Sequence, residues 1–306
     1  MNNKEKYNIF QGVEEDLSEG SFREILMPQR YNYIAVFLTL ECDLMCSYCI
    51  NLFSNKKKFP KVQITGREWV EGLNRIISRD DLPITLQGGE PSLHPDFIWI
   101  IKNLREDLNI DILTNLQFDV NEFIVQINPD RLKREAPYPS IRVSYHPEKM
   151  DLDRLILKVK LMQEAGFSIG IYGILHPQFN RAILDAQKKC RRLNIDFRTK
   201  EFLGEFNGKI YGTYLYPEAV AGAFRKRCLC RTTELIIGPS GSIYRCHRDL
   251  YEDSAPIGHL LDPDFQIEDK FRECRMYGYC NPCDIKIKTN RLQQFGHTSV
   301  EIKYIK

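Results

Sequence analysis

The sequence lacks the features of a membrane protein or a secreted protein. No apolar run in its 306 residues approaches the roughly 18 residues that a transmembrane helix needs. The N-terminus is polar and contains no apolar core of a secretory signal. The net charge is only +2, which gives no strong electrostatic case for nucleic acid or a membrane surface. We therefore expect a cytoplasmic protein with neither nucleic acid nor a membrane as its partner.

Cysteine, by contrast, is abundant, with ten residues in the chain. The composition, 43% hydrophobic and 27% charged, suits one large core or a core with a small appendage. Disulfides form and persist in oxidising compartments, which the absence of a signal argues against. Ten cysteines in a reducing compartment indicate metal or cluster chemistry.

Three of the cysteines lie close together, directly after the apolar run Tyr33–Leu40. They are Cys42, Cys46 and Cys49, in a C-x3-C-x2-C spacing. Iron–sulfur clusters are normally held by four cysteine thiolates. Three thiolates on one tight loop can hold three corners of a cubane cluster and leave the fourth iron open for a substrate or cofactor. A zinc site, a disulfide framework and coincidence in a cysteine-rich chain are the alternatives.

Strand-like and helix-like segments alternate through the first two thirds of the chain. The capping box Thr65–Glu68 begins one helix, and others are expected over Asp151–Ala165, ended by Gly166, and from Asn180 to Leu193. This alternation predicts an α/β fold of six βα units around a parallel sheet, with the chemistry on loops at the strands' C-terminal ends. The six expected strands are Tyr33–Leu40, Ile84–Leu86, Ile110–Thr114, Ile141–Ser144, Phe167–Leu175 and Ile195–Arg198.

A glycine-rich segment follows the second expected strand. It contains Gly88, Gly89, Glu90 and Pro91 in succession. Two glycines let the backbone approach a ligand closely. Their carbonyls, with the Glu90 carboxylate nearby, can accept hydrogen bonds from an ammonium group. An ordinary Gly-Gly turn with a proline stop is the alternative.

The triplet and this loop together resemble the radical S-adenosylmethionine (SAM) enzymes, over about residues 33–204. The resemblance implies a partial (β/α)6 TIM-like barrel and a [4Fe–4S] cluster whose fourth iron is chelated by the amino and carboxylate groups of SAM. It also implies that Tyr48 fills the aromatic position before the third cysteine. The segment Gly88–Pro91 looks like the family's GGEP motif, which binds the SAM amino group.

The resemblance implies further cofactor contacts at the ends of later strands. Thr114 and Asn115 close the third strand, and Ser144 closes the fourth, where a polar residue commonly contacts SAM. Strand-end turn chemistry is the alternative at each position. His146 is a structural histidine or a proton donor. The segment Gly170–Gly173 departs from the family's usual glycine pattern for packing adenine.

Six further cysteines lie between residues 228 and 283. The short strands expected at Leu235–Ile237 and Ser242–Tyr244, joined by a turn at Gly238–Gly241, form a hairpin that brings its flanking cysteines together. A C-x2-C pair follows at Cys280, so four thiolates from the two pieces can make a closed metal or cluster site. The six are Cys228, Cys230, Cys246, Cys274, Cys280 and Cys283. Cys190 lies in a helical pattern and is expected to be a buried small hydrophobe.

This region resembles the SPASM and shorter twitch extensions of radical SAM enzymes, which hold auxiliary [4Fe–4S] clusters. The spacing from Cys228 through Gly241 to Cys246 fits, but the last three cysteines do not follow the full SPASM pattern. The resemblance therefore implies one auxiliary cluster in a small cysteine-rich β-hairpin and helix extension. Its expected ligands are Cys228, Cys246, Cys280 and Cys283. A zinc ribbon is the alternative.

Cys230 and Cys274 are left over by this assignment. Either thiol can replace one of the four ligands, be inert, or donate a hydrogen atom to a substrate radical. The expected domains are an N-terminal extension (1–32), a barrel (33–204), an auxiliary cluster domain (205–290) and a tail (291–306).

The resemblance implies an enzyme that reductively cleaves SAM to a 5′-deoxyadenosyl radical, which abstracts a hydrogen atom from a substrate carbon. The first expectation is oxidative modification, dehydrogenation or cross-linking, with the auxiliary cluster as electron acceptor. Epimerisation with Cys230 or Cys274 as hydrogen donor is the alternative, and a non-catalytic zinc-ribbon interaction protein is the alternative of another class. The expected partners are a small-molecule, carbohydrate or peptide substrate and an external electron donor such as a flavodoxin or ferredoxin. Residues 1–32 are too few for a winged-helix leader-binding domain.

Overall fold

The computed structural model describes residues 22–52, 63–79, 82–220, 222, 224–288 and 296–305. Most of the expected N-terminal extension and part of the expected tail lie outside these residues. In the part of the chain that is described, no helix has the length and apolarity to cross a bilayer.

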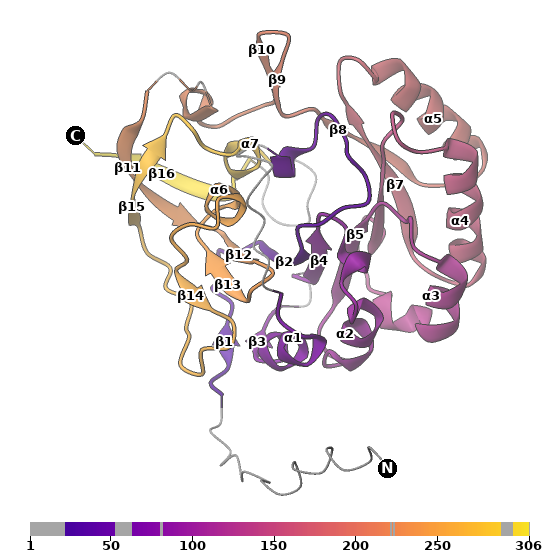
Figure 1. The fold of residues 1–306 in the computed structure, drawn as a ribbon, viewed down its shortest axis with the longest axis horizontal. Helices are drawn as coiled ribbons and strands as arrows, with labels where there is room; N and C mark the ends of the chain where they lie inside the picture. The colour runs from indigo at the N-terminus through magenta and orange to yellow at the C-terminus, as the bar shows by residue number, and fades with distance from the viewer. Residues whose placement is uncertain are drawn as a thin grey trace, which may run out of the picture.

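A nine-stranded sheet forms the centre of the molecule (Figure 1). Its strand order is β14-β13-β12-β2-β4-β5-β6-β7-β8, and the last six strands are parallel and follow one another along the chain. The prediction of a partial barrel on six parallel strands is therefore confirmed, with five helices in the connections between them. The six strands are β2 (Tyr33–Thr39), β4 (Ile84–Gly88), β5 (Ile110–Thr114), β6 (Ile141–Tyr145), β7 (Ile169–Leu175) and β8 (Phe197–Glu201).

Helices connect these strands and cover the outer side of the sheet, where α3, α4 and α5 are seen in Figure 1. The capping box predicted at Thr65 is present, with its side chain accepting from the Glu68 backbone N–H. Asp151 caps α4 by accepting from the Arg154 backbone N–H, and Gly166 ends it with a φ of 93°. The five helices are α1 (Gly66–Leu73), α2 (Phe97–Asn103), α3 (Val120–Gln126), α4 (Leu152–Glu164) and α5 (Asn180–Arg192).

The predicted C-terminal hairpin is present, and it extends the barrel sheet. Strands β12 (Glu234–Ile237) and β13 (Ser242–Tyr244) pair antiparallel, with Ile236 opposite Tyr244. β12 also pairs in parallel with β2, and β14 (Gly258–His259) pairs with β13. All four residues of β12 are buried. Part of the segment expected to form the auxiliary domain therefore lies directly beside the first barrel strand.

A separate three-stranded sheet completes the C-terminal region, on the opposite side of the molecule from α4 and α5 (Figure 1). It contains β11 (Lys226–Thr232) between β15 (Arg272–Tyr277) and β16 (Val300–Tyr304), all antiparallel. Two short helices, α6 (His247–Tyr251) and α7 (Pro282–Ile285), pack between this sheet and the barrel. The remaining elements are β1 (Ile25–Leu26), β3 (Ile76–Ile77), β9 (Gly204–Phe206), β10 (Lys209–Tyr211) and the 3-10 turns at Ile50–Leu52, Pro91–Leu93, Pro129–Leu132 and Pro217–Val220.

Candidate active site

The cysteine triplet lies on the loop that leaves the C-terminal end of β2. Cys42 is exposed, Cys49 is half-buried and Cys46 is buried. The Leu44 backbone N–H donates to the Cys42 sulfur at 3.4 Å. Burial, with smaller contributions from neighbouring carboxylates and triplet thiols, raises the pKa of Cys46 to about 12 and that of Cys42 to about 11. Since a metal deprotonates the thiol that coordinates it, this donor set fits a group of iron ions held by three thiolates.

The glycine loop after β4 is pressed against the cysteine loop. A Cβ at Gly88 would lie 2.0 Å from the Thr39 carbonyl oxygen, and a Cβ at Gly89 would lie 2.0 Å from the Glu41 carbonyl oxygen. The backbone N–H groups of Gly89 and Glu90 donate to Thr39 and Glu41 at 2.9 and 2.7 Å. Only glycine permits this approach, which places the two predicted motifs at one end of the barrel.

Glu90 joins the end of β4 to the end of β5. Its buried carboxylate accepts from the Ser92 hydroxyl at 2.7 Å, the Thr114 hydroxyl at 2.8 Å and the Asn115 backbone N–H at 2.7 Å. Burial raises the pKa of Glu90, while these hydrogen bonds oppose the rise. Pro91 begins the 3-10 turn that follows. Glu90 and Thr114 thus hold the loop in place, and their expected contacts with SAM stay predictions.

Asn115 extends the same network to the cysteine loop. Its side-chain amide donates to the Asp43 carboxylate at 2.5 Å and lies 3.9 Å from the Cys42 sulfur. Ser144 lies at the penultimate position of β6 and is half-buried. Because the C-terminal ends of parallel strands meet at one edge of a sheet, the expected cofactor residues gather at that edge.

Tyr48 packs into an aromatic group beside the cysteines. Its hydroxyl lies 3.1 Å from Nδ1 of His146, and its ring stacks on His176 with 4.8 Å between ring centroids. Phe179 lies next to both rings. Burial lowers the pKa of His146 to about 4, so the ring is neutral at pH 7 and Nδ1 can accept a hydrogen bond from the Tyr48 hydroxyl. Tyr48 therefore fixes the cysteine loop against β6 and β7.

This low pKa predicts a specific loss of stability in acid. Between pH 6.5, the ordinary histidine pKa, and about 4, the unfolded chain binds a proton at His146 that the folded protein does not. The free energy of unfolding should therefore fall by up to about 1.4 kcal/mol per pH unit from this group. His146→Gln keeps an acceptor for Tyr48 but cannot titrate. Denaturant unfolding at pH 7, 6 and 5 should show a shallower decline for the variant, and parallel profiles would contradict this assignment.

A cavity of about 270 Å³ lies next to the two loops. The Asn51 amide donates to the Gly88 carbonyl at 2.9 Å, and the Tyr251 hydroxyl donates to the Asn51 side-chain oxygen at 2.8 Å. Asn51 therefore links the cysteine loop, the glycine loop and α6. Residues of the C-terminal segment close one side of the cavity opposite Tyr48, Cys49 and His146; they include Glu234, His247, Tyr251, Cys283, Lys286 and Lys288.

Sequence reasoning missed these polar C-terminal residues. His247 Nδ1 lies 2.8 Å from the Asp284 carboxylate, and Glu234 pairs with Lys288. Buried charges are normally paired in this way. The only local signal was the presence of charged residues in otherwise apolar segments, such as Glu234 at the start of β12. Their position beside the cavity follows from the pairing of β12 with β2.

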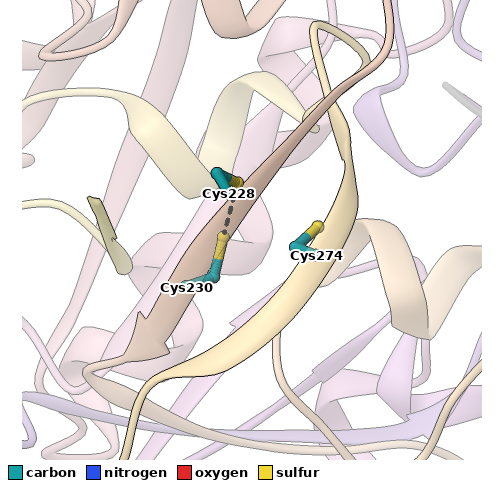
Figure 2. A group of neighbouring side chains, drawn as sticks. All are labelled: Cys228, Cys230 and Cys274. Carbon is teal, nitrogen blue, oxygen red and sulfur yellow. Dashed lines mark hydrogen bonds between the residues drawn. The ribbon is translucent and has the colours of Figure 1, made fainter. Parts of the chain in front are cut away.

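Three C-terminal cysteines converge between β11 and β15 (Figure 2). The sulfurs of Cys228, Cys230 and Cys274 all lie within 4.8 Å of one another, and the first two are 3.5 Å apart. Residues two apart on a strand share a face, and Cys228 is paired with Cys274 across the ladder. Hydrogen bonds among the three thiols lower the pKa of Cys274 and raise that of Cys230.

The other C-terminal cysteines divide between two places. Cys246 and Cys280 line a small pocket of about 20 Å³ together with Cys230 and Cys274. Cys283 lines the 270 Å³ cavity with Cys49. Of the predicted auxiliary ligands, Cys228, Cys246 and Cys280 therefore lie near Cys230 and Cys274. Cys283 lines the 270 Å³ cavity instead. Cys190 is fully buried in α5, as expected of a small hydrophobe.

No family model matches the chain. The GTP 3′,8-cyclase of Aquifex aeolicus (strain VF5) is 25% identical over 185 residues, which are 56% of this chain and 56% of that protein. Molybdenum cofactor biosynthesis protein 1 of Drosophila melanogaster is 25% identical over 199 residues, which are 60% of this chain and 34% of that protein. The chain thus spans about half or less of these relatives' length.

A solved structure described as native anSMEcpe with bound AdoMet and Kp18Cys peptide shares the fold. Its TM-score is 0.50 at 14% identity, over 75% of this chain and 78% of that chain. The predicted motifs and these sequence relatives agree with that fold. The motif spacing, the barrel and these similarities together support placing the chain in the radical SAM superfamily.

Proposed function

We propose that the chain reductively cleaves SAM and uses the resulting 5′-deoxyadenosyl radical to remove a hydrogen atom from a substrate carbon. The bound cluster, held by Cys42, Cys46 and Cys49, would supply the electron. The observation that carries the proposal is the packing of the cysteine loop on Gly88 and Gly89 at the edge of the 270 Å³ cavity. This arrangement supports a single site in which the triplet would hold the cluster, the glycine loop would bind the SAM amine, and the adjacent cavity would take the substrate.

The chain's own residues orient the reactants and exclude water from this site. Asn51 and Tyr251 hold the C-terminal segment over the cavity, and Tyr33 and Phe37 add apolar surface from β2. Exclusion of water prevents side reactions of a reactive intermediate. The expected external electron donor, a flavodoxin or ferredoxin, would deliver its electron near Cys42, the exposed thiol of the triplet.

The second part of the proposal is an auxiliary [4Fe–4S] cluster at the C-terminal thiols. It would accept an electron from the substrate radical and so give an oxidative modification. The clustering of Cys228, Cys230 and Cys274 beside Cys246 and Cys280 supports a metal centre there, and it adds two thiols to the ligand set expected from sequence. Sulfurs this close also suit a single zinc ion, whose Zn–S bonds of about 2.3 Å place ligand sulfurs about 3.8 Å apart.

Metal analysis separates these two centres. The protein purified without oxygen should be brown and contain about eight irons and eight sulfides, four of each per cluster. Cys274→Ala should lower the iron content to about four while 5′-deoxyadenosine is still formed from SAM. Cys190→Ala, a buried thiol in α5, is the matched control and should keep all of the iron. About one zinc with about four irons per chain would contradict the auxiliary cluster.

Epimerisation remains the alternative reaction, and one observation bears on its hydrogen donor. Among the described residues that line the 270 Å³ cavity, the cysteines are Cys49 and Cys283, and neither Cys230 nor Cys274 is among them. A donor thiol must reach the substrate radical, so Cys283 is better placed than the two thiols considered from sequence. In deuterated water, epimerisation would put solvent deuterium on the product carbon, whereas oxidation would give a product two hydrogens lighter.

Peptides, small molecules and carbohydrates are the candidate substrates. The solved structure of the same fold holds a peptide, whereas one sequence relative is named as a GTP cyclase. The charge of the residues that line the adjoining cavity bears on which of these substrates would bind.

A further inference from the structure

A second cavity, of about 500 Å³, adjoins the cavity beside the cysteine loop. Lys200, Glu201, Lys286 and Lys288 line both spaces. The second cavity is lined by residues along β6, β7 and β8, with Arg142 and Arg198 near the N-terminal ends of β6 and β8, and by the segment after α7. We call it the basic chamber, because five of its lining side chains are basic and one is acidic; the basic ones are Arg142, Arg198, Lys200, Lys286 and Lys288.

Arg142 is the most buried guanidinium of the basic chamber, with its side chain 9% exposed. It shares one carboxylate, that of Asp111, with Arg134, at distances of 2.9 and 2.8 Å. Two buried guanidinium groups therefore share one carboxylate as their negatively charged partner. Among the described residues, Nε of Arg142 has no hydrogen-bond partner. A buried donor left without a partner is costly, so an acceptor brought by a ligand would relieve it.

Among the residues that the structure describes, the carboxylates named around the chamber are fewer than its cations. Glu201, the acidic lining residue, accepts from the backbone N–H and the hydroxyl of Thr213, both at 3.0 Å. Asp196 pairs with Arg198 at 2.9 Å, and Glu234 pairs with Lys288. Lys200 lies 4.9 Å from the centre of the Tyr172 ring, and Lys286 is half-buried. With Arg134 included, six cations face the four carboxylates of Asp111, Asp196, Glu201 and Glu234.

We propose that the basic chamber binds an anionic group of the substrate, a phosphate or a carboxylate, and so places the adjoining part of the substrate in the cavity beside Cys49. Guanidinium and ammonium groups are the usual protein partners of both anions. The assignment of the smaller cavity as the reacting site rests on the proposed function, whereas the binding of an anion in the chamber does not.

The test is equilibrium binding of anions to the iron-loaded protein, without SAM and without reductant. Inorganic phosphate, pyrophosphate and succinate are titrated by calorimetry under anaerobic conditions at constant ionic strength. At least one of these probes should bind saturably. Tighter phosphate or pyrophosphate binding indicates a phosphorylated substrate, and tighter succinate binding indicates a carboxylated one.

Variants then locate the bound anion. Lys286→Gln should weaken binding of the best probe by about tenfold, Lys286→Arg should keep it within about threefold, and Arg198→Gln should also weaken it. Lys188→Gln, on the exposed face of α5, removes the same charge far from the chamber and should change nothing. Absence of saturable binding, or equal losses in Lys286→Gln and Lys188→Gln, would overturn the proposal. Because no SAM is cleaved in this assay, such a failure leaves the radical chemistry to be judged separately.

Discussion

Gly89→Ala is expected to lower the rate of 5′-deoxyadenosine formation by at least about 10²-fold while the protein stays folded. The new Cβ would lie 2.0 Å from the Glu41 carbonyl oxygen and 2.6 Å from that of Leu40. Both atoms belong to the backbone of the cysteine loop and cannot rotate away. Forced overpacking of this kind costs about 1–3 kcal/mol, and a shift of about 1 Å at a reacting centre can cost about 10²-fold in rate.

The added methyl group should push the glycine loop away from the cysteine loop. The protein should stay folded, because neither loop forms part of the main hydrophobic core. SAM binding, measured by equilibrium dialysis on the iron-loaded protein, should weaken together with the rate. Gly208→Asn is the control: Gly208 lies in the turn between β9 and β10, a Cβ added there would meet nothing within 4 Å, and asparagine tolerates its φ of 74°. A Gly89→Ala enzyme with wild-type rate and SAM affinity would show that this loop does not hold the cofactor.

The second large effect is expected from Cys46→Ala. Cys46 is the buried member of the triplet, and it is the thiol that the cluster would bind on the inner side of the loop. Loss of one of only three protein ligands should release this cluster, lower the iron content from about eight to about four per chain, and reduce SAM cleavage to the protein-free background.

Cys190→Ala again provides the matched comparison, because it removes the same sulfur from a fully buried site in α5. Both substitutions should lower the free energy of unfolding by about 1 kcal/mol through lost packing. Only Cys46→Ala should lose iron and activity. Equal iron content and equal rates in the two variants would rule out the triplet as the ligand set of the SAM-binding cluster.

The barrel could be predicted from the sequence because its signals are local. The run Tyr33–Thr39 is apolar up to its final threonine, as expected of a parallel strand buried on both faces, and the structure buries all seven residues. The Thr65 capping box and Gly166 mark helix ends within a few residues. The position of the hairpin could not be predicted in the same way. Its parallel pairing with β2 joins segments about 200 residues apart, and no local pattern specifies that partner.

In the candidate site, too, motifs within one loop could be predicted from sequence, whereas contacts between distant segments could not. The spacing of Cys42, Cys46 and Cys49 is contained in one loop and is readable directly. The meeting of Cys228 with Cys274 depends on the register of β11 against β15, so sequence left Cys274 outside the expected ligand set, as a replacement ligand, an inert thiol or a hydrogen donor. The period-two spacing of Cys228 and Cys230 was a usable signal that these thiols share a face. The basic chamber is built from β6, β8 and the segment after α7, and it becomes visible only when these elements are assembled.

Formation of 5′-deoxyadenosine from SAM is the most direct test of whether this chain generates a radical. The iron-loaded protein is incubated with SAM and dithionite without oxygen, and 5′-deoxyadenosine and methionine are quantified by mass spectrometry. Both products should form in equal amounts, their formation should require reductant, and Cys46→Ala should abolish it. No 5′-deoxyadenosine above background, from protein that carries about eight irons per chain, would rule out radical generation by this chain.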